Sequence, residues 1–270
     1  MSRRIHVRHL RGGEPIQLEP AEAHHARDVL RLADGAAVEV FDDAGAVGRG
    51  VLILSEGDVL VRVEPEELVP PTNTGLALVV AAAVPKGDRA DWMVEKLSEL
   101  GVAEFVPLAA ARSVVLPGGR GKRDRWLRIA TEAAKQSRRA GVMRITELTE
   151  LEDAVARAPS MGAVWLLSTE EPHATPIGDA LDRLPPGRSL TAFVGPEGGW
   201  TAQERERFAA AGATPVRLTA TVLRVETAAV AVAAVVACFA PGTARTGPLD
   251  DAAPADDDPA QEGATTGTPP

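Results

Sequence analysis

Cysteine is almost absent from this chain. Cys238 is the only one among 270 residues, so no internal disulfide can form. A chain without disulfides is typical of a reducing compartment, and we therefore expect a cytoplasmic protein. Cys238 lies in an apolar segment, and we predict that it is a small core residue.

Long apolar runs are missing as well. The longest uninterrupted one, Ala228 to Ala240, has thirteen residues, whereas a membrane-spanning helix needs about twenty. The N-terminal sequence MSRRIHVRHL contains no apolar stretch of the signal-peptide type. We therefore expect no membrane partner.

Two familiar nucleotide-binding motifs are also missing. The apolar run from Leu76 to Val84 leads into Pro85-Lys86-Gly87, where a dinucleotide-binding fold would carry G-x-G-x-x-G. An ordinary Rossmann-type methyltransferase or dehydrogenase is therefore disfavoured. Gly121-Lys122 is followed by arginine rather than Ser or Thr, and position 116 is leucine rather than glycine, so a Walker loop is rejected.

The charge is unevenly distributed along the chain. The formal net charge is −9, and the segment 242–270 alone contributes −5 with no large apolar residue beyond Leu249, so we expect a disordered acidic tail there. The segment 112–144 contains ten basic residues and only two acidic ones, Asp124 and Glu132. This basic patch indicates an anionic partner such as nucleic acid, although a solvated helix face would look the same.

Residues 4–63 show short strand patterns around one helix, which is predicted over 20–32. Such closely spaced strands favour a small barrel. The adjacent His24 and His25 point in different directions on a helix, so we predict no metal site. The strands are predicted at 4–8, 16–18, 37–41, 47–54 and 59–63.

A linker rich in proline and turn formers, 65–75, leads into a larger region. There strands alternate with helices, which indicates a parallel α/β sheet. Asp88 is the predicted cap of the first helix, and a basic, glycine-rich loop is predicted over 109–123. Strands are predicted at 76–84, 104–108, 144–147, 163–168, 190–194 and 215–218, and helices at 88–100, 124–139, 150–158, 176–184, 202–211 and from about 226.

The stretch 190–227 contains two turns of the kind that bind ligands. The first, Gly195 to Gly199, follows a buried strand, and Thr201 with Glu204 has the spacing of a capping box that starts a helix. The second, 218–224, connects the next strand to the apolar helix. Ligands of open α/β sheets bind at such strand-to-helix turns, although the glycines could serve only to make the turn tight.

The combination of motifs resembles a known enzyme family. GPEGGW (195–200) with its capped helix, followed by VLRVETAAVAV (222–232), is similar to the uridine N3-methyltransferases of small-subunit ribosomal RNA, within the knotted SPOUT class of S-adenosylmethionine-dependent enzymes. The similarity continues upstream and spans about residues 1–240. It is carried there by PKGDRADWMVEKLSELGV (85–102), ARSVV (111–115) and EAAKQSRR (132–139).

The resemblance implies an α/β fold with three parts. These are a PUA-like RNA-binding β-barrel over 1–70, a SPOUT methyltransferase domain with a trefoil-knotted parallel sheet over 71–241, and the acidic tail over 242–270. It also implies methylation of N3 of a uridine in 16S ribosomal RNA, with the small ribosomal subunit as partner and a homodimer as the assembly. Two alternatives are a SPOUT 2′-O-ribose methyltransferase and a non-catalytic RNA-binding protein.

We expect S-adenosylmethionine to be held by three neighbouring turns, which are Leu167-Ser168, Gly195 to Gly199 and Leu218 to Arg224. Arg224 is the expected stabiliser of the uracil anion, and Glu197 or Glu226 would accept the N3 proton or hold the arginine. Both acids could instead only cap helix starts. The expected cofactor-binding residues are Leu167, Ser168, Val194, Gly195, Pro196, Glu197, Gly198, Gly199, Leu218, Val222, Leu223 and Arg224.

Arginines dominate the expected RNA-binding set, since a guanidinium makes bidentate bonds to phosphates and base edges. Any single one could instead form a surface salt bridge. Three positions depart from the family pattern: Thr219 and Arg138 stand where glycine is common, and Lys135 where an acid is common. The candidates are Arg3, Arg4, Arg8, Arg27, Arg31, Arg112, Gln136, Arg138 and Arg139.

Overall fold

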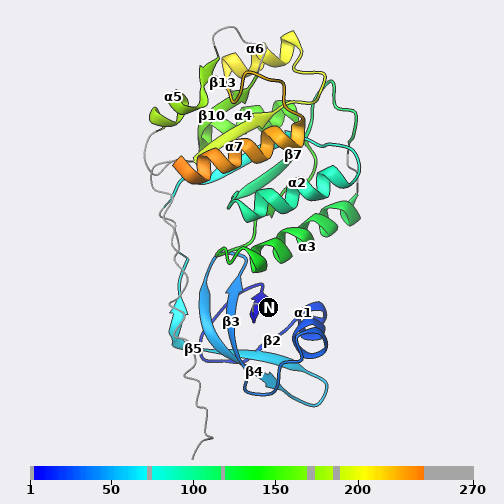
Figure 1. The fold of residues 1–270 in the computed structure, drawn as a ribbon, viewed down its shortest axis with the longest axis vertical. Helices are drawn as coiled ribbons and strands as arrows, with labels where there is room; N and C mark the ends of the chain where they lie inside the picture. The colour runs from blue at the N-terminus through cyan, green and yellow to red at the C-terminus, as the bar shows by residue number, and fades with distance from the viewer. Residues whose placement is uncertain (1–2, 72–74, 117–118, 169–173, 185–188, 240–270) are drawn as a thin grey trace, which may run out of the picture.

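The computed structural model describes residues 3–71, 75–116, 119–168, 174–184 and 189–239, and the predicted acidic tail lies outside them. Figure 1 shows two regions along the long axis of the molecule. A small sheet near the N-terminus lies beside one end of a larger sheet, and the larger sheet carries helices on its faces.

The small sheet has five strands in the order β1-β3-β4-β5-β2, and only the β1–β3 pair is parallel. It curls into a half-barrel rather than the closed small barrel that we predicted, because the edge strands β1 and β2 do not pair with each other in the described residues. Its elements are β1 (Arg4–Val7), β2 (Ile16–Gln17), α1 (Pro20–His24), the π-helical turn η1 (His25–Val29), β3 (Ala37–Asp42), β4 (Val47–Leu54) and β5 (Val59–Val69).

Two boundaries in this region differ from prediction. The helical segment ends at Val29, three residues early, after a π-type turn in which the Leu30 N–H donates to the His25 carbonyl over 2.8 Å. β5 extends through half of the predicted linker, to Val69. A shift of register opposite Gly48 and Gly50 leaves Pro65 without a ladder partner, so its missing N–H costs no hydrogen bond.

The larger sheet is parallel throughout, in the order β11-β13-β10-β12-β6-β7-β8, with β9 also beside β7. Its strands are β6 (Leu78–Ala83), β7 (Glu104–Ala109), β8 (Arg144–Ile145), β9 (Thr149–Glu150), β10 (Gly162–Leu167), β11 (Thr175–Pro176), β12 (Ser189–Val194) and β13 (Thr214–Arg217). Its helices are α2 (Asp88–Glu99), α3 (Arg120–Gln136), α4 (Leu151–Met161), α5 (Ile177–Asp182), α6 (Ala202–Ala210) and α7 (Val225–Phe239).

Both faces of the larger sheet are buried, which explains the unbroken apolar runs of its strands. Alternate residues of β6 belong to two different cores: Val80 packs with α2, α3 and α7, whereas Val79 packs with α4 and α6. Leu97 of α2 and Val232 of α7 are fully buried in the first core. The apolar stripe of α2 and the predicted apolar helix that starts near residue 226 therefore both cover the sheet.

Three predictions for this region are wrong. Gly87, with φ of 64°, occupies the cap position of α2, so Asp88 is an acid of the first turn and not the cap. α3 begins at Arg120 rather than Asp124, which shortens the predicted basic loop. Cys238 is exposed in the last turn of α7 rather than part of the core.

Charged side chains join the two sheets through α3. Arg4 of β1 is only 2% exposed, and its guanidinium donates to the carbonyl oxygens of Ala134 at 2.9 Å and Arg139 at 2.8 Å. Glu22 of α1 forms a buried ion pair with Lys135 of α3. The position of the small sheet against the larger one thus depends on buried polar contacts.

Candidate functional site

The ends of three parallel strands meet at the carboxyl edge of the larger sheet. Leu167 at the end of β10 is in register with Val194 at the end of β12 and with Val216 of β13. The turns that follow these strands are therefore neighbours. The predicted convergence of the 167–168, 195–199 and 218–224 turns is the arrangement in the structure.

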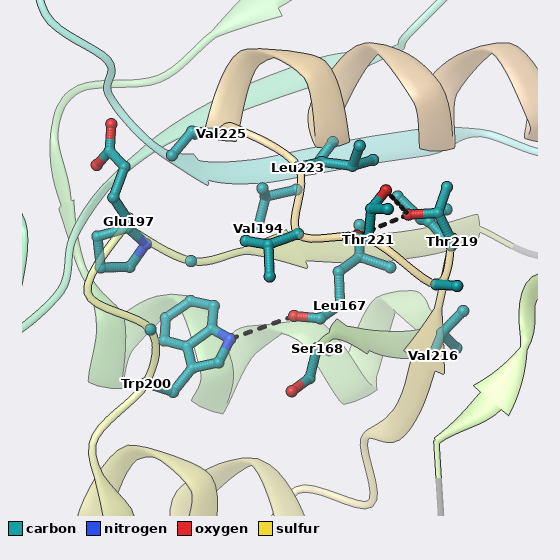
Figure 2. Close-up of a pocket in the computed structure, with 17 residues that line it drawn as sticks. Leu167, Ser168, Val194, Glu197, Trp200, Val216, Thr219, Thr221, Leu223 and Val225 are labelled. Atoms are coloured by element: carbon teal, nitrogen blue, oxygen red, sulfur yellow. Dashed lines mark hydrogen bonds between the residues drawn. The ribbon is translucent and has the colours of Figure 1, made fainter. Parts of the chain in front are cut away.

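A cavity of about 550 Å³ lies between these turns. Figure 2 shows residues that line it. Ten of the twelve expected cofactor-binding residues line it, and Gly198 and Arg224 flank it without lining it. Its lining is Leu167, Ser168, Val194, Gly195, Pro196, Glu197, Gly199, Trp200, Val216, Leu218, Thr219, Ala220, Thr221, Val222, Leu223, Val225 and Ala228.

The first turn is shaped by glycines and by a tryptophan that the prediction missed. Gly199 has φ of 67°, a conformation that favours glycine, and its N–H donates to the Pro196 carbonyl over 2.8 Å. A Cβ on Gly195 would lie 2.8 Å from the indole of Trp200. Trp200 is buried and its Nε1 donates to the Leu167 carbonyl at 3.4 Å, so it connects the first turn to β10.

The predicted capping box after this turn is confirmed. The Thr201 hydroxyl accepts from the Glu204 N–H, and the Glu204 carboxylate accepts from the Thr201 N–H. The same carboxylate accepts from the Ala111 N–H at 2.8 Å. Burial alone would raise the pKa of Glu204, but the hydrogen bonds from Thr201 and Ala111 outweigh it and lower that pKa.

The loop before α7 forms the opposite wall of the cavity. The Thr219 hydroxyl donates to the Thr221 carbonyl over 2.8 Å, a local bond that fixes the turn without a glycine at 219. Leu223 and Val225 both line the cavity. Arg224 between them is exposed, and its carbonyl accepts from the Ala228 N–H in the first turn of α7.

The two candidate acids have different surroundings. Glu197 is exposed and lines the cavity. Glu226 is 6% exposed, does not line the cavity, and pairs with Arg89 of α2, whose Nη1 lies 3.3 Å from its Oε1. This geometry opposes Glu226 as a direct proton acceptor and favours the alternative that it holds an arginine, with Arg89 in place of Arg224.

Most of this chain matches RNA methyltransferases. Residues 72–237 match the family model of an RNA methyltransferase domain, and residues 18–64 match that of an RNA methyltransferase PUA domain. The ribosomal RNA small subunit methyltransferase E of Bacillus subtilis is 30% identical over 213 residues, 77% of this chain and 83% of that protein. This chain belongs to that methyltransferase family.

Other relatives agree with this assignment. The protein of the same name from Mycobacterium tuberculosis is 34% identical over 216 residues, 77% of this chain and 80% of that protein. The Neisseria gonorrhoeae enzyme, solved bound to S-adenosyl methionine, superposes with a TM-score of 0.76 at 28% identity over 89% of this chain and 98% of that one. The predicted α/β fold, a SPOUT-type parallel sheet with an N-terminal PUA-like domain, is confirmed.

Two of the arginines expected to bind RNA contact other parts of the protein instead. Arg4 is buried, lies 2.6 Å from Glu39 and stacks on the ring of Phe41. Arg139 donates to the carbonyls of Ser98 and Val102, both at 3.0 Å, and burial lowers its pKa to about 10. Both predictions are corrected, because these guanidinium groups bind the protein's own backbone.

The other RNA-binding candidates stay predictions, and all have exposed side chains. Arg8 pairs with Glu19 and Arg27 with Asp28. Arg112 donates to the Gly198 carbonyl at 2.5 Å, which places it against the first turn of the cavity. The exposed candidates are Arg3, Arg8, Arg27, Arg31, Arg112, Gln136 and Arg138.

The basic segment 112–144 is less basic in space than in sequence. Acids from other elements neutralise several of its cations: Asp91 contacts Lys122 and Arg125, and Glu22 contacts Lys135. Arg123 and Arg144 pair with Glu147 and Glu104. The structure thus divides the predicted patch into paired cations and a few that face solvent.

The described part of the chain contains no group of three or more His, Cys, Asp or Glu side chains that could hold a metal ion. Each helix described there is too short or too polar to cross a bilayer.

Proposed function

We propose that this chain transfers a methyl group from S-adenosylmethionine to N3 of a specific uridine in 16S ribosomal RNA. The observation that carries the proposal is the cavity at the carboxyl ends of β10, β12 and β13, in a member of this methyltransferase family. Its volume of about 550 Å³ falls within the range of roughly 300–1,000 Å³ that is common for small-molecule sites.

The chemistry of the cavity suits this cofactor. Apolar side chains such as Leu167, Val194 and Leu218 offer a surface for a flat purine, and the backbone of 195–199 is accessible because its glycines carry no side chain. Ser168 adds a polar group for the ribose. When bound, S-adenosylmethionine supplies an electrophilic methyl group.

The chain's own residues must remove a proton and stabilise an anion. Methylation at N3 of uracil replaces the N3–H bond, so that proton needs an acceptor. We assign the acceptor role to Glu197, because it lines the cavity and reaches solvent. We assign stabilisation of the anion to Arg224, which is exposed between two lining residues.

The direct test is methylation of purified small ribosomal subunits that lack the modification, with isotope-labelled S-adenosylmethionine. Mass spectrometry of the nucleosides should find labelled 3-methyluridine, and mapping should find it at one position of 16S ribosomal RNA. Labelled 2′-O-methyl nucleoside would favour the ribose methyltransferase instead. RNA binding without bound cofactor or transferred label would favour the non-catalytic RNA-binding protein.

The roles within the site are tested by Arg224→Ala. Loss of an electrostatic stabiliser should lower the methylation rate about 10²–10³-fold, while the Kd for S-adenosylmethionine from calorimetry stays near that of the wild type. Arg183→Ala, an exposed arginine beyond α5, is the matched control and should keep the rate. A near-normal rate for Arg224→Ala would contradict the assignment.

We further propose that the protein acts as a homodimer in the cytoplasm, on the small ribosomal subunit. α7 supports the dimer, since it buries Val232 and Val236 against the sheet yet leaves Val235 partly exposed and Phe239 73% exposed. Light scattering of the purified protein should give twice the chain mass of 28.2 kDa. A monomer that methylates at full rate would contradict this part.

A further inference from the structure

A buried glutamate beside the cavity has an unsatisfied oxygen. Glu226 lies in the first turn of α7 and is 6% exposed. Its Oε1 contacts Arg89 Nη1 at 3.3 Å, which is a long distance for a charge-assisted bond, and its Oε2 has no hydrogen-bond partner. Buried carboxylate oxygens are normally satisfied, so this one needs an explanation.

Stability is a poor explanation for the pair. Burying a carboxylate costs free energy that one long contact to a partly exposed guanidinium does not recover. The side chain of Arg89 is 40% exposed, so part of the charge of the pair faces solvent. A function in holding Arg89 at a defined place is the better explanation.

Arg89 lies close to the cavity in the fold, although it does not line it. α2 begins after the short segment 84–87 that follows the carboxyl end of β6. β6 is the neighbour of β12, with Ala82 in register with Val194. The first cavity turn follows Val194. Glu226, to which Arg89 is attached, follows Val225, and Val225 lines the cavity. Arg89 therefore lies on the same edge of the sheet as the cavity, on the α2 side.

We propose that Arg89 is a substrate-positioning residue that binds a phosphate of the RNA strand entering the cavity, and that Glu226 holds its guanidinium there. This inference rests on the proposed function. A guanidinium has five N–H donors, so a contact to Glu226 leaves donors for an anion. Phosphate is the anion that RNA presents along its whole length. Because Oε2 has no partner, the guanidinium can rotate and bond both carboxylate oxygens of Glu226 when the RNA strand fixes its position.

The test uses three variants of the full chain: Arg89→Ala, Arg89→Lys and Glu226→Gln. Arg207→Ala is the matched control, because Arg207 is also a half-exposed arginine in one ion pair, with Glu152 on the α4–α6 face. The probe is an unmodified 16S ribosomal RNA transcript, with binding measured by fluorescence anisotropy over a series of salt concentrations. Calorimetry gives the Kd for S-adenosylmethionine, and methylation of the RNA with labelled cofactor gives kcat and KM. Thermal unfolding confirms that each variant folds.

Loss of a phosphate contact changes the salt dependence of RNA binding, whereas loss of a purely structural contact does not. Arg89→Ala should weaken RNA binding about tenfold and reduce the slope of log K against log salt by about 0.7–0.9. Arg89→Lys should restore the slope, since it keeps the charge. Glu226→Gln should keep the slope but lower kcat, because the guanidinium is no longer held. The cofactor Kd should be unchanged in all three.

Other outcomes overturn the inference. An unchanged slope and KM for RNA in Arg89→Ala would mean that Arg89 meets no phosphate. A cofactor Kd that rises as much as the RNA Kd would mean that the pair only supports the cavity wall. If the wild type bound RNA but methylated nothing, the proposed function would fail, whereas the slope difference between wild type and Arg89→Ala would still test the phosphate contact.

Discussion

The cations at the junction of the two sheets and the cations at the carboxyl edge of the larger sheet look alike in the sequence, but they have different roles in the structure. At the junction, Arg4, Lys135 and Arg139 contact carboxylates or backbone carbonyls inside the protein. At the carboxyl edge, Arg112 and Arg224 are exposed beside the cavity. An arginine-rich motif therefore indicates an anionic partner only where the fold leaves the guanidinium in solvent.

The sharpest test of this contrast is replacement of Arg4 by methionine. The change would leave Glu39 and the carbonyls of Ala134 and Arg139 without their buried partner, and removal of one member of a buried pair typically costs about 3–5 kcal/mol. The free energy of unfolding from urea titration should fall by that amount. RNA affinity, measured on the folded variant, should change little.

Arg8→Met is the matched control for that variant. Arg8 also pairs with a glutamate at 2.6 Å, but its side chain is 72% exposed. Exposed pairs contribute about 0–1 kcal/mol, so the control should cost little stability. Equal losses in the two variants would show that burial does not separate the two classes of arginine.

The next largest effect is expected at the carboxyl edge, from Gly195→Ala. The added Cβ would meet the Trp200 indole at 2.8 Å, and such overpacking typically costs about 1–3 kcal/mol. Because Trp200 also lines the cavity, its displacement should weaken binding of S-adenosylmethionine at least tenfold in calorimetry. Gly178→Ala, in the open surface of α5, should leave binding unchanged, and similar behaviour of both variants would contradict this account of the cavity.

Backbone geometry was easier to predict from the sequence than the partners of charged side chains. The capping box at Thr201 and Glu204, and the convergence of three turns at one sheet edge, follow from local spacing and from strand alternation. The partner of Lys135, by contrast, is Glu22, which lies 113 positions away. No local pattern encodes a pair of that kind, and the same holds for Arg89 with Glu226.

A smaller effect with a defined pH dependence is expected from Glu204→Gln. The lowered pKa of Glu204 means that its contribution to stability is complete above the unfolded pKa of about 4.3 and is lost as the pH falls through the folded pKa. Loss of the capping acid should cost about 1 kcal/mol at neutral pH. Urea unfolding of wild type and variant should therefore converge at low pH.

Glu206→Gln, an exposed acid of the same helix, is the control for this pH dependence. It should remain as stable as the wild type at neutral pH. A difference between wild type and Glu204→Gln that persists below the folded pKa would mean that the amide, rather than the lost charge, disturbs the helix start. In that case the hydrogen bond from the Ala111 N–H to residue 204 would not require an ionised carboxylate.

The smallest effect is expected from Arg138→Gly at the junction. Arg138 has φ of 55°, in the left-handed region that favours glycine, and a non-glycine residue there costs roughly 1–2 kcal/mol. Part of this gain is offset by the greater flexibility of glycine in the unfolded chain, so the net gain in unfolding free energy should be below about 1 kcal/mol. The change also removes a charge whose repulsion helps to lower the pKa of Arg4, after the larger effect of burial.

Arg138→Ala keeps the strained backbone and should be less stable than the glycine variant in urea unfolding. If both variants weaken RNA binding equally while only Arg138→Gly gains stability, then Arg138 binds RNA and its strained backbone lowers the stability of the protein. An alanine variant as stable as the glycine variant would show instead that the strain is negligible.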